Sequence, residues 1–323
     1  MAFPRTSGAG RTWRGAALVT CIVIAIIVFN APGPNGNLRS AIAIHDFGHV
    51  AAFGLVTALV AFALRAQARV NFSGRVGAIC LAGVAALTLG AAVELAQAVN
   101  GLHGDPWDAV RDAGGAISVS LILVALDSKI SIRSRAVIAG AGLFVLAAFA
   151  YPVLAALNDE ARARAQFPLL ASFETRSELS RFHFGEGVSP SIGSIKDDEG
   201  RVLSAVQLYL PAGRYPGFQL RYFPRDWRGL RALQLLIVNP EKSPTEIGVR
   251  IDDTKYRFHM DDRYNREFPL SPGVNRIEIP LSDVAAAPRD RRFDLARVHS
   301  LLVFAVDIER PRSILIGPIT LLR

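Results

Sequence analysis

Residues 202–210 read VLSAVQLYL, a short run in which apolar and polar side chains partly alternate. A period of two is typical of a strand that buries one of its faces. Gly, Pro and Asp turns separate this run from similar segments, which recur at about 8–15-residue spacing. The other predicted strands are Gly217–Phe223, Ala232–Val238, Glu246–Ile251, Lys255–His259, Asn275–Leu281, Leu301–Val306 and Ile314–Leu321. This spacing predicts an all-β sandwich over residues 172–323.

Residues 1–157 have a different composition. They hold 11 of the 36 Lys and Arg residues and 6 of the 28 Asp and Glu residues. Their stretches without charge approach the roughly 20 residues that a spanning helix needs. These stretches are Gly15–Leu38, Phe47–Leu64, Val76–Val93, Ala113–Leu126 and Ala136–Asn158. We therefore expect an α-helical transmembrane bundle of about five helices over 1–157, with the short fourth stretch the weakest. Residues 158–171 are expected to be a linker, of which residues 158–167 read as a helical extension or linker that leaves the membrane.

The distribution of positive charge predicts the orientation in the membrane, because cytoplasmic loops are rich in Lys and Arg. One set of loops carries Arg5, Arg11, Arg14, Arg65, Arg69, Arg75, Lys129, Arg133 and Arg135; the opposite set carries Arg39 and Arg111. This predicts a multi-pass protein of the bacterial inner (plasma) membrane, with a cytoplasmic N-terminus and an extracytoplasmic C-terminal domain. The residues before Pro32 make a poor cleavage site, so we expect the first segment to be retained.

Composition excludes several classes of protein. With 51% hydrophobic and 20% charged residues, the chain does not have the composition of a disordered protein. Two cysteines, Cys21 and Cys80, are too few for a disulfide scaffold or a Cys-based zinc cluster. We attribute the net charge of +8 largely to the Lys and Arg residues that set the orientation in the membrane. The expected partner is therefore the lipid bilayer, and no nucleic acid is expected.

Polar residues gather at the predicted outer ends of three helices. They are His45, Asp46 and His49 in the second, Glu94 and Gln97 in the third, His103 in the loop that follows, and Asp108 and Asp112 in the fourth. Spacings of three or four residues place each pair on one helix face. Gly115 shares the face of Asp112, where a missing side chain lets helices approach closely. The three faces are expected to line one pocket.

Three interpretations of this cluster remain open. Its members pair with one another and stabilise the bundle, or they form a catalytic or ligand pocket. In the second case Glu94 or Asp108 is the general base and His49 the acid or hydrogen-bond donor. The third interpretation is a metal site, because two His four residues apart with carboxylates are zinc-like ligand types. The Glu that follows the first His in the metalloprotease motif is missing, so we expect no metal and no cofactor.

The same residues carry a family resemblance. Residues 44–49, Glu94-x-x-Gln97 and Asp108-x-x-x-Asp112-x-x-Gly115 resemble the VanZ-like membrane proteins over about residues 15–130. His45, Asp46 and Asp112 stand where the family has Asp, Lys and Asn, and His103 stands near its Arg. The resemblance implies a link, for some members, to glycopeptide-antibiotic resistance, and no general biochemical activity.

The C-terminal half carries a second resemblance. Residues 270–284, with Phe173-Glu174, residues 238–240, residues 251–253 and residues 316–321, are similar to jelly-roll carbohydrate-binding modules with a galactose-binding-like fold. A sugar site needs aromatic platforms and planar polar groups. The candidates are Trp227, Asp252, Asp253, Tyr256, Asp261, Asp262, Arg263 and Tyr264.

Together these observations predict a VanZ-like protein of the bacterial envelope that presents an extracytoplasmic glycan-binding β-sandwich. Its expected partner, besides the bilayer, is an envelope glycan or a cell-wall precursor. Two alternatives stay open at this point. The chain is a membrane enzyme that acts on a lipid-linked or cell-wall precursor through Glu94, Asp108 and His49, or it is a structural or interaction protein.

Overall fold

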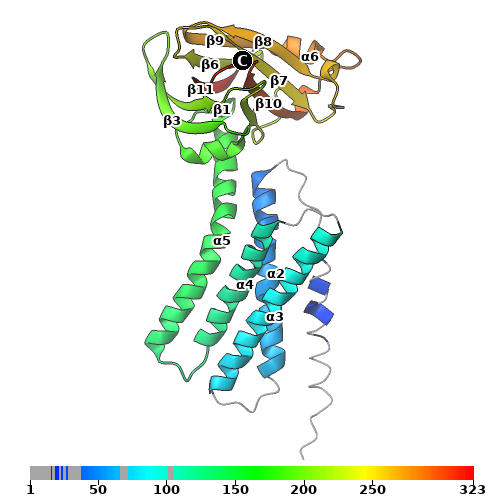
Figure 1. Ribbon diagram of the computed structural model, residues 1–323, viewed down its shortest axis with the longest axis vertical. Helices are drawn as coiled ribbons and strands as arrows, with labels where there is room; N and C mark the ends of the chain where they lie inside the picture. The colour runs from blue at the N-terminus through cyan, green and yellow to red at the C-terminus, as the bar shows by residue number, and fades with distance from the viewer. Residues whose placement is uncertain are drawn as a thin grey trace, which may run out of the picture. The chain divides into compact units, whose positions relative to one another are not determined.

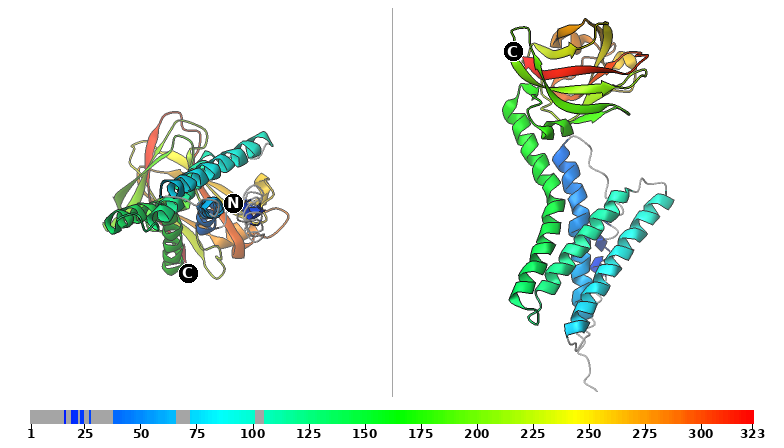
Figure 2. Two further views of the ribbon diagram at one scale, coloured as in Figure 1. Left: turned by 90° about the horizontal axis from the view of Figure 1, so that it is seen from below. Right: turned by 60° about the vertical axis from the view of Figure 1, so that its left-hand side comes forward.

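A computed structural model describes residues 38–65, 72–100 and 105–323, with a few isolated positions between 16 and 27. The chain forms two compact units, and the described part divides after residue 156. The first unit is helical, and the second is a β-sandwich that also includes Leu38 and Arg39 (Figures 1 and 2). Most of the first predicted helix, the basic position 69 and His103 lie outside the described residues.

The helical unit contains α2 (Arg39–Arg65), α3 (Phe72–Val99), α4 (Pro106–Ala125) and the first part of α5 (Ile132–Gln166). Among the described helices, α2, α3 and α5 are long and apolar enough to cross a membrane. Helix α4 is a regular 20-residue helix. It begins at Pro106, a favoured first residue, and the Asp105 side chain caps it by accepting from the backbone N–H of Trp107.

Glycine allows the helices to approach closely. A Cβ added at Gly115 of α4 would lie 2.1 Å from the carbonyl oxygen of Val50 in α2. A Cβ at Gly90 of α3 would lie 2.6 Å from a carboxylate oxygen of Asp112 in α4. The predicted close approach at Gly115 is confirmed, and the contact at Gly90 is of the same kind. These contacts bring the polar residues of α2, α3 and α4 together.

We expect Gly115→Ala to lower the unfolding temperature of the detergent-purified chain. The new methyl group would clash with backbone, which cannot rotate away as a side chain can, at a cost of about 1–3 kcal/mol. Gly77→Ala in α3 is the matched control, because a Cβ there meets nothing within 4 Å. Equal unfolding temperatures for the two variants would contradict the close packing of α2 on α4.

The sandwich consists of two antiparallel sheets that stack face to face (Figure 2). The six-stranded sheet has the order β3 (Ser189–Lys196), β4 (Val202–Leu210), β11 (Arg312–Leu322), β6 (Ala232–Asn239), β9 (Gly273–Pro280), with β1 (Leu169–Ala171) also paired to β11. The five-stranded sheet has the order β2 (Phe182–Phe184), β5 (Gly217–Leu220), β10 (Val298–Ala305), β7 (Thr245–Asp253), β8 (Tyr264–Leu270). The edge strands β3, β8 and β9 each contain a proline: Pro190, Pro269 and Pro280.

One hydrophobic core lies between the two sheets. Alternate residues of β6 and of β7 are fully buried in it, which is the period of two seen in the sequence. They are Leu233, Leu235 and Ile237 in β6, and Ile247, Val249 and Ile251 in β7. The intervening residues face outward. On the six-stranded sheet some of them form a second apolar cluster around Ile195, Ala205 and Leu236, whereas on the five-stranded sheet they include polar residues such as Arg250.

Several sequence predictions are corrected by the structure. Residues 255–259, predicted as a strand, form a loop in which Phe258 has a φ of 66° and an exposed side chain. Strands β1, β2, β3 and β8 were not expected, because two have only three residues and β3 is rich in Ser and Gly. In the segment 158–171, α5 continues to Gln166, which is the helical one of the two forms predicted for residues 158–167, and β1 begins at Leu169.

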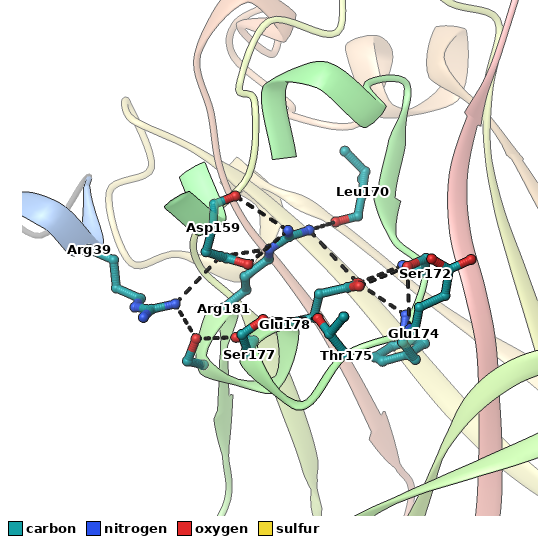
Figure 3. A network of polar contacts seen from close by, with 11 residues as sticks. Arg39, Asp159, Leu170, Ser172, Glu174, Thr175, Ser177, Glu178 and Arg181 are labelled. Atoms are coloured by element: carbon teal, nitrogen blue, oxygen red, sulfur yellow. Dashed lines mark hydrogen bonds and ion pairs between the residues drawn. The ribbon is translucent and has the colours of Figure 1, made fainter. Parts of the chain in front are cut away.

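A buried ion pair joins the end of α5 to the sandwich within the second unit (Figure 3). Arg181 is 1% exposed and donates from Nε and Nη2 to the two carboxylate oxygens of Asp159, at 2.9 and 3.0 Å. Its Nη1 donates to the carbonyl oxygen of Leu170 in β1, at 3.1 Å. The two-pronged geometry satisfies both charges away from water.

Glu178 completes this network from the six-residue 3₁₀ helix η1 (Arg176–Arg181). Its carboxylate accepts from the backbone N–H of Ser172 at 2.8 Å, from the Ser172 hydroxyl at 2.7 Å and from the backbone N–H of Phe173 at 3.0 Å (Figure 3). Hydrogen bonds to side chains, and not strand pairing, therefore fix the chain between β1 and β2.

We expect Asp159→Asn to destabilise the sandwich by about 3–5 kcal/mol, because it leaves the Arg181 charge buried without its main partner. The measurement is denaturant unfolding of the full chain with Trp13 and Trp107 replaced by Phe, so that the core residue Trp227 reports alone. Asp226→Asn, which breaks an exposed Asp–Arg pair, is the control and should have little effect. Equal midpoints for both variants would refute the role of the pair.

Candidate functional site

A row of outward-facing side chains crosses all five strands of the smaller sheet. The strand register places His183, Gln219, Leu302, Arg250 and Asn265 opposite one another in turn, from β2 to β8. Directly paired residues lie on the same face of a sheet, so these five form one line. They line a groove of about 390 Å³ on the outer face of the sandwich.

An aromatic floor lies at one end of this groove. Phe304 of β10 is paired with Gly217 on one side and with Gly248 on the other. A Cβ at Gly248 would lie 2.3 Å from the Phe304 ring, and one at Gly217 would lie 2.5 Å from the Phe304 Cα. Gly248 therefore leaves room for the ring to lie over the sheet, and Gly217 lets the backbone of β5 approach that of β10. The Tyr215 ring meets it edge-on, with centroids 5.4 Å apart, and is 56% exposed.

Two arginines and a tyrosine form the other end. The guanidinium carbons of Arg250 and Arg263 lie 4.9 and 5.6 Å from the centroid of the Tyr256 ring. Arg263 also donates from Nη1 to the Tyr256 hydroxyl, at 3.0 Å, and Arg250 donates from Nε to Asp252, at 2.9 Å. Stacking and hydrogen bonding together orient both guanidinium groups. Met260 lies in the loop before β8, and Arg263 is the last residue of that loop. Both line the groove at its arginine end.

Two of the ligand residues predicted from the sequence belong to this site: Arg263 lines the groove and Tyr256 supports it. Trp227 does not, because it is fully buried in the core. Its indole N–H donates to the carbonyl oxygen of Pro224 at 3.1 Å, and its ring packs on Phe223. No face of the Trp227 ring is available for stacking, and the proposed platform role is corrected to a core role.

The predicted aspartates have structural partners. Asp252 is buried and accepts from the Ser300 hydroxyl at 3.0 Å as well as from Arg250. Asp253 and Asp262 both accept from Arg291, at 2.8 and 2.5 Å. The hydrogen bond from Arg291 holds the pKa of Asp262 below its ordinary value. These carboxylates therefore orient the groove and its loop, and they do not face a ligand directly.

Two further candidates fall outside the groove lining. Tyr264 is buried in the core, and burial raises the pKa of its phenol. The side chain of Asp261 is exposed, and its carbonyl oxygen accepts from the backbone N–H of Arg289. Sequence reasoning missed Tyr215, Phe304, Gln219, His183 and Asn265. Four of them share one signal, a polar or aromatic residue at an outward position of a strand, which becomes informative only when the register is known; Tyr215 lies in the bend before β5.

The helical unit brings the predicted polar residues of α2 and α4 together. His49 Nδ1 lies 3.0 Å from Asp112 Oδ1, and His49 Nε2 lies 3.7 Å from Asp108 Oδ2. Arg111 donates to Asp46 at 2.9 Å and contacts Asp108. The imidazole of His45 lies 3.8 Å from Asp46. The polar faces of the two helices thus form one network of His, Asp and Arg.

Helix α3 contributes Glu94, with Gln97 three residues further along. Glu94 Oε1 and Asp112 Oδ2 are buried oxygens without a hydrogen-bond partner among the described residues. A buried acceptor without a hydrogen-bond partner lowers the stability of the fold by about 1–3 kcal/mol, so these two oxygens are candidates for a functional role. Within the described ranges, no group of three or more His, Cys, Asp or Glu residues is arranged to hold a metal ion.

No protein-family model matches the chain, and no curated protein matches it in sequence. Solved structures with some similarity include an exo-β-agarase, at 17% identity and a TM-score of 0.39, covering 47% of this chain and 24% of that one. A family 11 carbohydrate-binding module from Clostridium thermocellum, in complex with a β-1,3-1,4-mixed-linked tetrasaccharide, has 17% identity and a TM-score of 0.36, covering 48% and 94%. A family 30 carbohydrate-binding module of a cellulosomal cellulase from the same organism has 16% identity and a TM-score of 0.31, covering 43% and 88%. The matched part thus spans about a quarter of the agarase and most of each module.

Proposed function

We propose that this chain is a membrane-anchored glycan-binding protein and that the groove on the five-stranded sheet binds an extended sugar chain. The observation that supports this most is the combination of an aromatic floor, Phe304 with Tyr215, and a row of planar polar groups, Gln219, Arg250 and Asn265. Sugars present apolar ring faces that stack on aromatic rings and hydroxyl groups that bond to planar polar side chains. Five strands about 4.8 Å apart make the groove roughly 19 Å long, which suits an oligosaccharide.

The apolar helices support a membrane location. Three described helices are suited to spanning, and the Lys and Arg bias of the loops favours a cytoplasmic N-terminus. On this proposal the sandwich is extracytoplasmic, at the bacterial plasma membrane, and the ligand is a glycan of the cell envelope. The anchor then keeps the groove within reach of that glycan.

We expect Tyr215→Ala to weaken glycan binding about five- to tenfold, because it removes the exposed ring of the aromatic floor, at about 1–1.5 kcal/mol. The measurement is retention of the full chain, in nanodiscs, on immobilised envelope polysaccharides and mixed-linkage β-glucan. Tyr209→Ala is the matched control, since Tyr209 is exposed on β4 of the opposite sheet. A well-folded parent protein that binds none of these glycans would refute the proposal.

A second candidate function, an enzyme of the membrane, is favoured by the unpaired oxygens of Glu94 and Asp112 beside His49. A buried carboxylate with a free lone pair is suited to general-base chemistry, and the His49–Asp112 pair is suited to carry a proton. The substrate class on this hypothesis is a lipid-linked or cell-wall precursor.

For this second function we expect Glu94→Gln to abolish complementation of the envelope phenotype of a strain that lacks the chain, while protein abundance stays unchanged. The amide keeps the shape of the side chain and removes its basicity. Glu199→Gln in an exposed turn of the sandwich is the control. Lost abundance would instead show that Glu94 stabilises the bundle, and normal complementation would exclude it as a base.

A further inference from the structure

Arg263 carries a charge that the sandwich leaves unpaired. Arg181 and Arg291 each form ion pairs with carboxylates, whereas no ion pair of Arg263 is found in the sandwich, all of which the structure describes. Its one hydrogen bond goes to the neutral hydroxyl of Tyr256, and its Nε is buried without an acceptor. A guanidinium has five N–H donors, so most of its hydrogen-bonding capacity is unused.

Arg250 lies beside it with a second group of free donors. Only its Nε is engaged, by Asp252, and that carboxylate is itself buried and also bonded to Ser300. Both guanidinium groups contact the Tyr256 ring, and both arginines line the groove. Asp252 offsets the charge of Arg250, whereas Arg263 has no such carboxylate partner in the sandwich.

The one acidic residue that lines the groove lies at the other end. Glu267 is paired with Gly248, beside the aromatic floor, and lies four residues after Arg263 along the chain. At about 3.4 Å per residue this is roughly 13–14 Å, more than the screening length of about 8 Å at physiological salt. Glu267 is the diagonal neighbour of Arg250 across β7 and β8, but it forms no ion pair with Arg250 or Arg263 in the sandwich, so the charge of Arg263 stays without a carboxylate partner.

We infer that the glycan bound in this groove is acidic, with a negatively charged substituent held by Arg263 and Arg250. This rests on the proposed function of the groove. A planar, oriented guanidinium binds carboxylates and other oxyanions with paired hydrogen bonds, which a neutral sugar does not exploit. The charged substituent is a uronate carboxylate or a sulfate ester, since both offer the same oxygen acceptors.

The test compares matched charged and neutral polymers on the full chain in phosphatidylcholine nanodiscs. The probes are polygalacturonate and its carboxyl-reduced form, dextran sulfate and dextran, and mixed-linkage β-glucan. We expect binding of one charged polymer, its loss in the neutral counterpart, and weakening in high salt. Preference for polygalacturonate identifies a carboxylate, and preference for dextran sulfate identifies a sulfate ester.

Matched variants exclude unspecific attraction of polyanions. Arg263→Gln should weaken binding of the charged polymer about tenfold or more, because it removes charge-assisted hydrogen bonds. Arg276→Gln, on β9 of the opposite sheet, removes the same charge away from the groove and should leave binding unchanged. Equal losses for the two variants would overturn the inference.

The remaining outcomes separate this inference from the proposed function. Equal binding of charged and neutral partners, or binding of mixed-linkage β-glucan alone, would overturn the acidic ligand and keep a glycan-binding groove. Absence of binding to every polymer by a folded protein would overturn both.

Discussion

The buried pair of Arg181 and Asp159 is the interaction on which the sandwich most depends. An arginine that is almost completely removed from water is tolerated only when its charge and its donors are satisfied, and here a carboxylate and the carbonyl of Leu170 satisfy them. The backbone of Arg181 continues the same function, since its carbonyl oxygen accepts from the N–H groups of Arg221 and Tyr222. Strand β2 begins at the next residue. The pair thus fixes the edge strand that brings His183 to the groove.

The groove itself follows from side-chain size on neighbouring strands. Gly217 and Gly248 flank Phe304: the missing side chain of Gly248 gives the ring its place on the sheet, and that of Gly217 lets the backbones of β5 and β10 approach. The polar residues of the groove stand at the intervening outward positions. An aromatic surface and a polar surface therefore share one face of one sheet, while the opposite face of the same strands supplies the core. In the helical unit glycine has a related effect, because Gly90 and Gly115 bring polar helix faces into contact.

The sequence predicted the architecture better than the site. Helix-length apolar stretches and a period of two are local signals in the sequence. The helices α2, α3 and α5 and strands such as β4 and β6 could therefore be predicted from it. The partners of a side chain are not local. The sequence does not show which of Trp227 and Tyr215 is buried. In the fold, Trp227 is a core residue and Tyr215 is an exposed residue of the groove. The loop with Tyr256 and Phe258 shows the converse, because aromatic residues with strand propensity lie there outside any sheet. In α2 and α4 the spacing of His49, Asp108 and Asp112 was sufficient, since helix faces follow directly from residue number.

The prolines of the edge strands affect how copies of the protein can associate through their sheets. An open sheet edge offers unpaired N–H and C=O groups to any other strand, and proline removes a donor from that edge. Edge strands β3, β8 and β9 each contain one, and the other two edge strands, β1 and β2, have only three residues each. Each sheet edge is therefore either short or carries a proline at or next to one end of its strand. On the proposed membrane location, copies of the protein meet far more often than they would free in solution, and this fold resists turning those encounters into shared sheets.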